Sequence, residues 1–218
     1  MISRRTLLSA ALALLVAGSA TAQTANRPTP GFVRVRLDTS MGAITVALDA
    51  RRAPKTTANF LAYVDDGRFD DTSFYRAARR KTDPKLGFVQ GGIRTNARRM
   101  LPTFPHEPTS RTGIRHTDGT ISMARVGNGS AGGNFFITVG AMPSMDAGPR
   151  YAGYAAFGHV VAGMDVVRRI LAERTGGGSD AMKGQMIYRD IRIVRAKRLD
   201  GTPKPTGQPK TWLWGLGR

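Results

Sequence analysis

Apolar and polar residues alternate in short runs along most of the chain, from about residue 33 to residue 196. The first run places Val33, Val35 and Leu37 on one side and two arginines on the other, which is typical of a half-buried strand. A Met-Gly turn separates it from a second run at residues 44–48, so the pair predicts a β-hairpin. Further β-type runs are predicted at residues 73–76, 87–91, 120–125, 134–139, 155–160 and 187–194.

Two segments have the longer period of an amphipathic helix. The first begins at Pro54, which suits the first turn of a helix, and stops at Gly67. Its apolar face holds Thr57, Phe60, Leu61 and Val64. The second helix has its apolar face at Met164, Val166, Val167, Ile170 and Leu171. Seven or eight strands with only two helices predict a mainly all-β domain, either a barrel or a sandwich.

The first 22 of the 218 residues have the pattern of a cleaved export signal. Arg4 and Arg5 precede an apolar stretch, and Ala-Thr-Ala at residues 20–22 matches a cleavage site, so the mature chain is expected to begin near Gln23. An uncleaved membrane anchor is the alternative, although the stretch is short for a membrane span. The arginine pair also resembles the twin-arginine motif. The general and the twin-arginine routes both stay open, and either one predicts a periplasmic protein without a stable membrane anchor after cleavage.

The remaining chain divides into three parts by composition. Residues 23–31 predict a mobile leader, and residues 32–198 are long enough for one domain with a real core. Residues 199–218 form a basic tail rich in proline and glycine, which we expect to be extended and disordered. Both tryptophans, Trp212 and Trp214, lie in a small apolar patch of this tail.

The charge of the chain is strongly positive. Removal of the signal takes away two arginines and no acid, which leaves 31 basic against 15 acidic residues and a net charge of +16. Nucleic acid is one partner that such a charge suits. The basic residues are scattered, however, without the aromatic interleaving of single-strand binders. We therefore expect no nucleic-acid partner, and attraction to an anionic cell surface is the simpler consequence. The chain has no cysteine, so packing without disulfides must hold the domain together.

Two other patterns resemble known functional motifs but lack the sequence context that those motifs require. Residues 127–132 match G-x-G-x-x-G, yet a β-type run follows where the dinucleotide fingerprint requires a helix. We interpret this segment as a loop between strands. His106, His116 and His159 lack metal-ligand spacing, and Ser122 with His116 lacks a nucleophile elbow. The sequence therefore predicts no metal, no organic cofactor and no hydrolytic triad.

Five segments in a fixed order carry a family resemblance. They are Phe-Tyr-Arg at residues 74–76, Phe-Val-Gln-Gly-Gly at 88–92, Thr-Ile-Ser-Met-Ala-Arg at 120–125, Asn-Phe-Phe-Ile-Thr-Val at 134–139 and Ala-Ala-Phe-Gly at 155–158. In this order they resemble the cyclophilin family of peptidyl-prolyl cis-trans isomerases, over roughly Val33 to Ala196. The resemblance implies a closed eight-stranded antiparallel β-barrel capped by two α-helices, a choice that the pattern alone could not make.

The resemblance also implies the site. Arg76 matches the catalytic arginine, Gln90 the glutamine that orders this arginine, and Phe136 the floor of the proline pocket. Ala124 and Arg125 match the edge where backbone groups pair with the substrate. The positions at the wall and rim of the pocket are Phe88, Met145 and Tyr154.

This chemistry is conformational and needs no cofactor. An X-Pro bond rotates over a barrier of about 18–20 kcal/mol because rotation breaks amide resonance. Twisting makes the proline nitrogen pyramidal and more basic, so an arginine aimed at it favours the transition state. We expect a monomeric isomerase that acts on proline-containing polypeptides and assists folding. A non-catalytic proline-peptide binder or chaperone module on the same barrel is the alternative, since a fold does not dictate a function.

The chain departs from the family pattern at three places. Residues 77–87, between Arg76 and Gln90, form a longer insertion than usual, which leaves Phe88 either at the pocket wall or next to it. Ser144 stands where the family has a pocket tryptophan, and Tyr154 stands where it has a histidine. These two replacements predict weak binding of cyclosporin.

Overall fold

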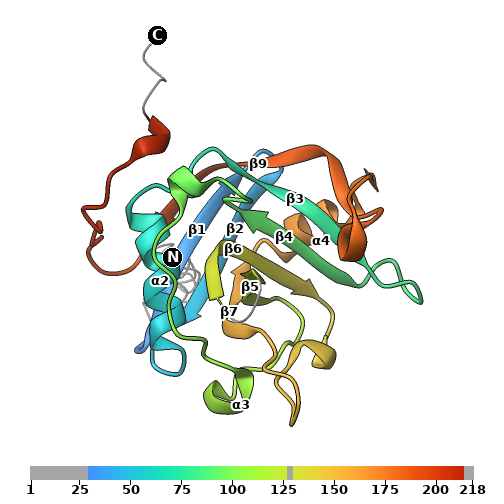
Figure 1. The fold of residues 1–218 in the computed structure, drawn as a ribbon, viewed down its shortest axis with the longest axis horizontal. Coiled ribbons are helices and arrows are strands. Elements are labelled where there is room, and N and C mark those ends of the chain that lie inside the picture. Colours follow the sequence, from blue (N-terminus) through green and yellow to red (C-terminus); the bar gives the residue numbers. More distant parts are fainter. Residues whose placement is uncertain (1–28, 127–129, 214–218) are drawn as a thin grey trace, which may run out of the picture.

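The protein, seen here as a computed structural model, is described over residues 29–126 and 130–213. Nine strands occur among these residues, and eight of them close into an antiparallel barrel (Figure 1). Around the barrel the order is β1, β2, β7, β5, β6, β4, β3 and β9, and β9 pairs back with β1. The strands are β1 (Phe32–Thr39), β2 (Gly42–Asp49), β3 (Thr72–Arg79), β4 (Gly87–Gly92), β5 (Thr120–Val126), β6 (Ser130–Val139), β7 (Ala155–Ala162), β8 (Thr175–Gly176) and β9 (Met186–Arg198).

The two predicted helices are present at the two sides of the barrel in Figure 1. They are α2 (Pro54–Asp65) and α4 (Met164–Ala172). As predicted, α2 starts with its proline and ends before Gly67, whose φ of 68° is the left-handed conformation that stops a helix. The predicted closed barrel is confirmed, with one correction to its cap. A third helix, α3 (Thr109–Thr112), has only four residues, too few to give a periodic signal in the sequence.

The predicted strands are confirmed, and the structure adds detail at their ends. The two-residue strand β8 pairs with the start of β9, and no pattern predicted it. The two ends of the insertion, residues 77–79 and residue 87, belong to β3 and β4, and residues 80–86 form the connection between these strands. The segment at residues 127–132, read as a loop, enters β6 at Ser130, and residues 127–129 lie outside the described part.

The adjacent phenylalanines of β6 define the two faces of the barrel wall. Successive side chains of a strand point to opposite faces. Phe135 is 0% exposed and lies inside the barrel, with its ring centroid 5.3, 5.4 and 5.7 Å from those of Phe60, Phe69 and Phe74. Phe136 points to the outer side. The interior is completed by other fully buried residues, Val35, Leu37, Ile44, Val46, Leu48, Val89, Ile121, Met123 and Ile137.

The start of the predicted tail runs beside the end of α2. The backbone N–H of Lys204 donates to Asp65 at 2.9 Å, and that of Thr206 donates to Asp66 at 2.7 Å. The guanidinium of Arg68, itself 1% exposed, pairs with Asp66 at 2.8 Å and donates to the carbonyl of Pro209 at 3.4 Å. Residues 201–210 form neither helix nor strand, and they have defined hydrogen-bond partners beside α2.

The predicted signal peptide, residues 23–28 of the leader and residues 214–218 with Trp214 lie outside the described residues. Among the described helices, none has the length and apolar character that crossing a membrane requires.

Candidate active site

Four side chains from four adjacent strands form one row on the outer face of the barrel wall. The strand registers pair Arg76 of β3 with Gln90 of β4, Gln90 with Phe136 of β6, and Phe136 with Ser122 of β5. Side chains that face one another across a pair of strands lie about 4.5–5.5 Å apart and interact directly. The register therefore brings together all three predicted catalytic residues, with Ser122 as a fourth member that the sequence did not assign to the site.

A local irregularity of β3 turns Arg76 to this face. The pairing of β3 with both neighbours shifts register between Phe74 and Arg76. In a regular strand these two residues would share a face. Phe74 is fully buried inside the barrel, whereas Arg76 is half-buried. A bulge that re-aims a side chain in this way is common beside active sites.

The guanidinium of Arg76 is held by four hydrogen bonds. Its Nη1 donates to Gln90 Oε1 at 3.0 Å, and its Nε and Nη2 donate to Gln185 Oε1 at 2.9 and 2.7 Å. The other Nη2 hydrogen is directed to the carbonyl of Ala181 at 3.1 Å. A guanidinium has five N–H groups. Among the described residues no partner takes the fifth, on Nη1, so the cation is rigidly oriented with one donor left over.

Gln90 connects Arg76 to a buried tyrosine. Because a guanidinium can only donate, Oε1 of Gln90 has to face Arg76, and this fixes the orientation of the amide. Its Nε2 then donates to the hydroxyl of Tyr75 at 2.9 Å. Burial raises the pKa of Tyr75 to about 12, so the phenol keeps its proton at neutral pH. Burial also lowers the pKa of Arg76, which nevertheless stays a cation because an arginine starts so high.

The aromatic residues of the site surround Phe136. Its ring centroid lies 5.3 Å from that of Phe88, 5.3 Å from that of Tyr154 and 5.8 Å from that of His116. The guanidinium carbon of Arg76 lies 5.0 Å from the centre of the Phe88 ring, which places the cation at the edge of this cluster. Phe88 therefore does contact Phe136, despite the insertion before it. Phe136 itself is only 2% exposed, so the predicted pocket floor is covered by a half-buried rim.

The remaining predicted site residues lie beside Tyr154. The guanidinium carbon of Arg125 is 5.1 Å from the Tyr154 ring and 5.5 Å from that of Tyr151. Met145 is half-buried in the short turn η2 (Pro143–Met145), and its carbonyl accepts the N–H of Tyr154 at 3.0 Å. Ala124 is 7% exposed in β5, next to Arg125 in sequence. These residues thus border the cluster through Tyr154.

Sequence reasoning missed two contacts of the site. Gln185 lies 109 residues after Arg76 in an irregular segment, and no pattern marks a lone glutamine there as its partner. His116 was weighed only as a metal ligand or a triad member, whereas its ring stacks on Phe136 with an interplanar angle of 12°. The one sequence signal that could have placed His116 near the site is its position shortly before β5.

A hollow of about 490 Å³ lies elsewhere, between residues of β3 and β9 and the segment that follows β4. It is bounded by ionic residues that include Arg94, Arg99, Asp190 and Arg192, and it shares no residue with the row of Arg76. Arg94 and Asp190 pair with each other at 2.7 Å. Among the described residues, no cluster of three or more histidine or acidic side chains could hold a metal ion.

Comparison with known sequences finds similarity to a family of isomerases. Residues 33–198 match the family model described as cyclophilin type peptidyl-prolyl cis-trans isomerase/CLD. The chain is similar to peptidyl-prolyl cis-trans isomerase A of Dickeya dadantii, with 33% identity over 165 residues that cover 74% of this chain and 84% of that protein. It is also similar to the peptidyl-prolyl cis-trans isomerase cyp18 of Streptomyces antibioticus, with 37% identity over 168 residues, 73% of this chain and 98% of that protein.

Solved structures agree on the fold. A cyclophilin type peptidyl-prolyl cis-trans isomerase of Cryptosporidium parvum is similar with a TM-score of 0.60 and 22% identity, over 78% of this chain and 99% of that one. A crystal structure of the same protein in the presence of the dipeptide Ala-Pro gives a TM-score of 0.58 at 22% identity, over 75% of this chain and 96% of that one. At this identity the likeness concerns the barrel itself.

Proposed function

The chain belongs to the cyclophilin type peptidyl-prolyl cis-trans isomerase family, and from this premise we infer that it rotates X-Pro bonds at the row of Arg76, Gln90 and Phe136. The observation that carries this assignment is the state of Arg76. Its cation is fixed by four hydrogen bonds beside an aromatic cluster and keeps one donor unused among the described residues. A catalyst of bond rotation needs such a preorganised donor next to an apolar site.

In this mechanism the aromatic cluster holds the proline ring and Arg76 acts on its nitrogen. The ring of the substrate proline packs against Phe136 between Phe88 and Tyr154. As the bond twists, the nitrogen becomes pyramidal and gains electron density, and the remaining Nη1–H of Arg76 donates to it. Gln90 keeps the guanidinium in place. In the planar cis and trans forms this lone pair is delocalised into the carbonyl group and accepts poorly. The donor therefore stabilises the twisted form selectively.

Proline-containing polypeptides are the substrate class that we propose. The relative from Cryptosporidium parvum was crystallised in the presence of Ala-Pro, which supports a site for this dipeptide unit in the family. In the present chain Ala124 and Arg125 offer strand backbone beside Tyr154, where an extended peptide could pair. We propose that the protein works as a monomer without cofactor.

A binding module on the same barrel is the alternative function, and one assay separates the two. Residues 23–218 are added to an X-Pro peptide whose trans form alone is cleaved by a protease, and the slow cleavage phase is followed. An enzyme accelerates this phase in proportion to its concentration. A protein that binds the same peptide in a titration, yet leaves the slow phase unchanged, would be a non-catalytic binder.

We also propose that the clients are exported polypeptides in the periplasm. The support is the signal pattern of residues 1–22, with Arg4 and Arg5 before an apolar stretch. Mass spectrometry of the protein from its native host should find an N-terminus at or near Gln23. An intact Met1 would contradict export by cleavage. Replacement of both arginines by lysine should abolish export if the twin-arginine route is used and leave it unchanged for the general route.

A further inference from the structure

Three buried polar side chains form a hydrogen-bonded row beneath the site. Asp146 Oδ1 lies 2.7 Å from His116 Nδ1, and His116 Nε2 lies 2.9 Å from Ser122 Oγ. Asp146, His116 and Ser122 are 9%, 1% and 0% exposed. Because a carboxylate only accepts, Nδ1 carries the ring proton and donates it to Asp146, and Nε2 accepts the hydroxyl hydrogen of Ser122. A neutral imidazole therefore satisfies every member of the row.

The order of these side chains is that of a hydrolytic triad, but their burial excludes that chemistry. A nucleophile has to reach the carbonyl carbon of its substrate. Ser122 is 0% exposed and stands opposite Phe136 in the strand register, so no substrate atom can approach its hydroxyl. The row must therefore serve the molecule in another way.

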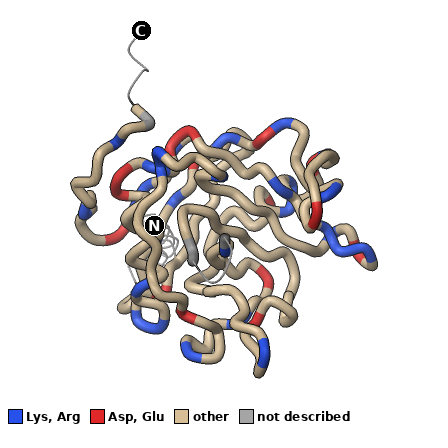
Figure 2. Tube along the Cα trace, in the orientation of Figure 1, with Lys and Arg blue, Asp and Glu red and all other residues tan. Residues whose placement is uncertain are grey.

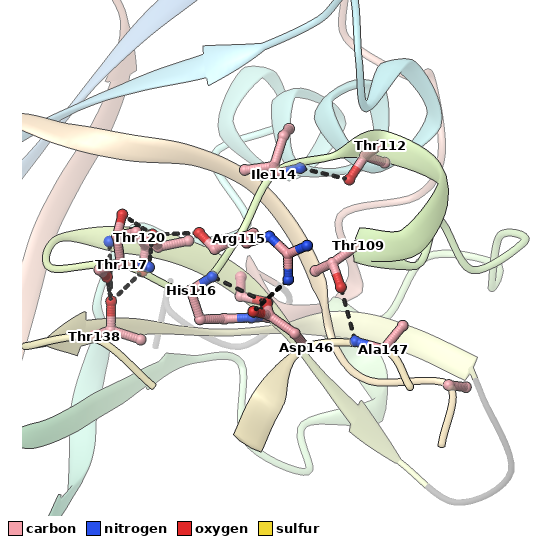
Figure 3. Close-up of polar contacts among 12 residues, drawn as sticks. Thr109, Thr112, Ile114, Arg115, His116, Thr117, Thr120, Thr138, Asp146 and Ala147 are labelled. Atoms are coloured by element: carbon pink, nitrogen blue, oxygen red, sulfur yellow. Dashed lines mark hydrogen bonds and ion pairs between the residues drawn. The ribbon is translucent and has the colours of Figure 1, made fainter. Parts of the chain in front are cut away.

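His116 is bound to the wall segment of the site, which we define as residues 142–146. Its backbone N–H donates to Asp146 Oδ1 at 3.1 Å, and its carbonyl accepts the N–H of Met142 at 2.7 Å. Together with the ring bond, three hydrogen bonds join His116 to this segment. Figure 3 shows the ring and backbone of His116 converging on the carboxylate of Asp146. A neighbouring bond, from the N–H of Ala147 to Thr109 Oγ1 at 2.7 Å, fixes the far end of the segment.

The same imidazole lies against the floor of the site. Its ring stacks on Phe136 with an interplanar angle of 12° and a centroid distance of 5.8 Å. Phe136 meets Tyr154 edge to face at 5.3 Å, and Tyr154 is tied by its N–H to Met145 in the wall segment. His116 thus contacts the floor through its ring face and the wall through its hydrogen bonds. Tyr154 also contacts both, but it is joined to the wall segment by one hydrogen bond, against three for His116.

The imidazole of His116 is neutral at neutral pH because it is buried, and the charges around the row do not reverse this. Burial lowers the pKa of His116, and the hydrogen bond and charge of Asp146 oppose this shift. Arg115 also faces the carboxylate, with its Nη1 3.8 Å from Asp146 Oδ2, but its side chain is 76% exposed. Such an exposed contact contributes little.

We propose that His116 and Asp146 are positioning residues that hold the wall segment against Phe136 and so set the shape of the proline site. This inference rests on the proposed function. The proline ring touches floor and wall in the planar and the twisted forms alike, so their spacing contributes equally to the binding of both. Loss of the pair therefore raises KM and leaves kcat nearly unchanged, unlike the loss of a donor that acts only on the twisted bond.

The test compares Asp146→Ala with Asp146→Asn and with a matched control. Asp146→Ala removes the acceptor of the two hydrogen bonds that His116 donates to Asp146, from its backbone N–H and from its ring. We expect KM for an X-Pro peptide to rise about tenfold, with kcat within about twofold of the wild-type value. Asp146→Asn keeps an acceptor in the same place and should restore most of the affinity. The control is Asp66→Ala, which also removes a buried carboxylate that accepts a hydrogen bond from a buried side chain, that of Arg68, but lies at the end of α2. It should lower stability without a change in KM of the folded protein.

An unchanged KM in folded Asp146→Ala, or an equal change in Asp66→Ala, would overturn the proposal. If Asp146→Ala does not fold, the wild type decides, because ¹⁵N spectra of its histidines should show a proton on Nδ1 of His116 and none on Nε2. A proton on Nε2 instead would contradict the hydrogen-bond directions assigned to Asp146, His116 and Ser122. Direct titration of the peptide separates this inference from the proposed function. A wild type that binds without catalysis would end the isomerase assignment, while about tenfold weaker binding by Asp146→Ala would still support the positioning role.

Discussion

The two faces of β6 carry aromatic clusters of similar size and opposite character. Inside the barrel, Phe135 contacts three other phenylalanines, and all four rings are fully buried. Outside, Phe136 contacts Phe88, Tyr154 and His116, two of which carry polar atoms. Two cations border this outer cluster, with Arg76 over Phe88 and Arg125 over Tyr154. Figure 2 shows lysine and arginine spread over the described part of the chain, so the total charge does not single out this face.

The difference shows that two adjacent residues can serve different purposes, Phe135 the stability of the barrel and Phe136 the site. Adjacent strand residues must point to opposite sides, so the pair Phe135-Phe136 supplies one ring to each cluster. The inner ring has only apolar neighbours and can contribute nothing but packing. The outer ring has hydrogen-bonded and charged neighbours whose positions depend on partners elsewhere in the chain. The predictions that follow test this division.

The largest effect is expected from Phe135→Ala. Truncation of a fully buried aromatic ring removes contacts and leaves a cavity, which typically costs about 3–5 kcal/mol of stability. Urea unfolding followed by circular dichroism measures the loss. The smaller change Phe135→Leu should keep the protein folded and leave kcat/KM within about threefold. If folded Phe135→Leu loses as much activity as Phe136→Leu, the division between the two clusters is wrong.

Cyclosporin binding sharpens the description of the outer cluster. Ser144 is exposed in η2 and supplies no ring to the rim. A buried aromatic side chain contributes about 1.5–3 kcal/mol, so affinity should be lower than in family members with tryptophan there by about tenfold or more. Calorimetry of the wild type and of Ser144→Trp measures the difference, and the variant should bind more tightly. Tight binding by the wild type, unchanged in Ser144→Trp, would refute the assignment of this position.

Gln90→Leu removes one of the two glutamines that orient Arg76. A hydrogen bond to a charged group contributes about 1.5–3 kcal/mol, so kcat/KM should fall about tenfold or more. Stability should change little, since Gln90 is only half-buried on the outer face. Steady-state kinetics together with an unfolding curve measure both. A variant with normal kcat would show that the four-bond geometry of Arg76 is not needed.

The smallest effect is a pH dependence of stability that belongs to His116. Burial lowers the pKa of His116 in the folded protein below the ordinary histidine value of 6.5. The unfolded chain therefore binds more protons below that value, and stability is complete above pH 6.5 and falls as the pH drops. Stability should therefore be lower at pH 5.5 than at pH 6.5. Urea unfolding at both values should show that His116→Gln lacks this loss, and an identical slope in the variant would contradict it.

The sequence predicts most strands and helices of the barrel because the signals for them lie in neighbouring residues. Alternation at Val33, Val35 and Leu37 sets a strand face, and Pro54 and Gly67 mark the ends of α2. The closure of the barrel came from resemblance, since period alone cannot tell which strands pair. Gln185, the His116 row and the partners of the tail were not predictable. Each depends on hydrogen bonds between distant or irregular segments, for which residue type gives no periodic signal.

The measurement that tests the central claim most directly is the activity of Arg76→Ala at a temperature where it is as fully folded as the wild type. Removal of one preorganised donor typically costs about 2.7–4 kcal/mol, so kcat/KM should fall about a hundredfold or more. Arg76→Lys should not restore it, because an ammonium lacks the planar fork that Gln90 and Gln185 hold. Equal rates for Arg76→Ala and wild type, both above background, would place the catalytic donor elsewhere, with Arg79 and Arg80 the next candidates.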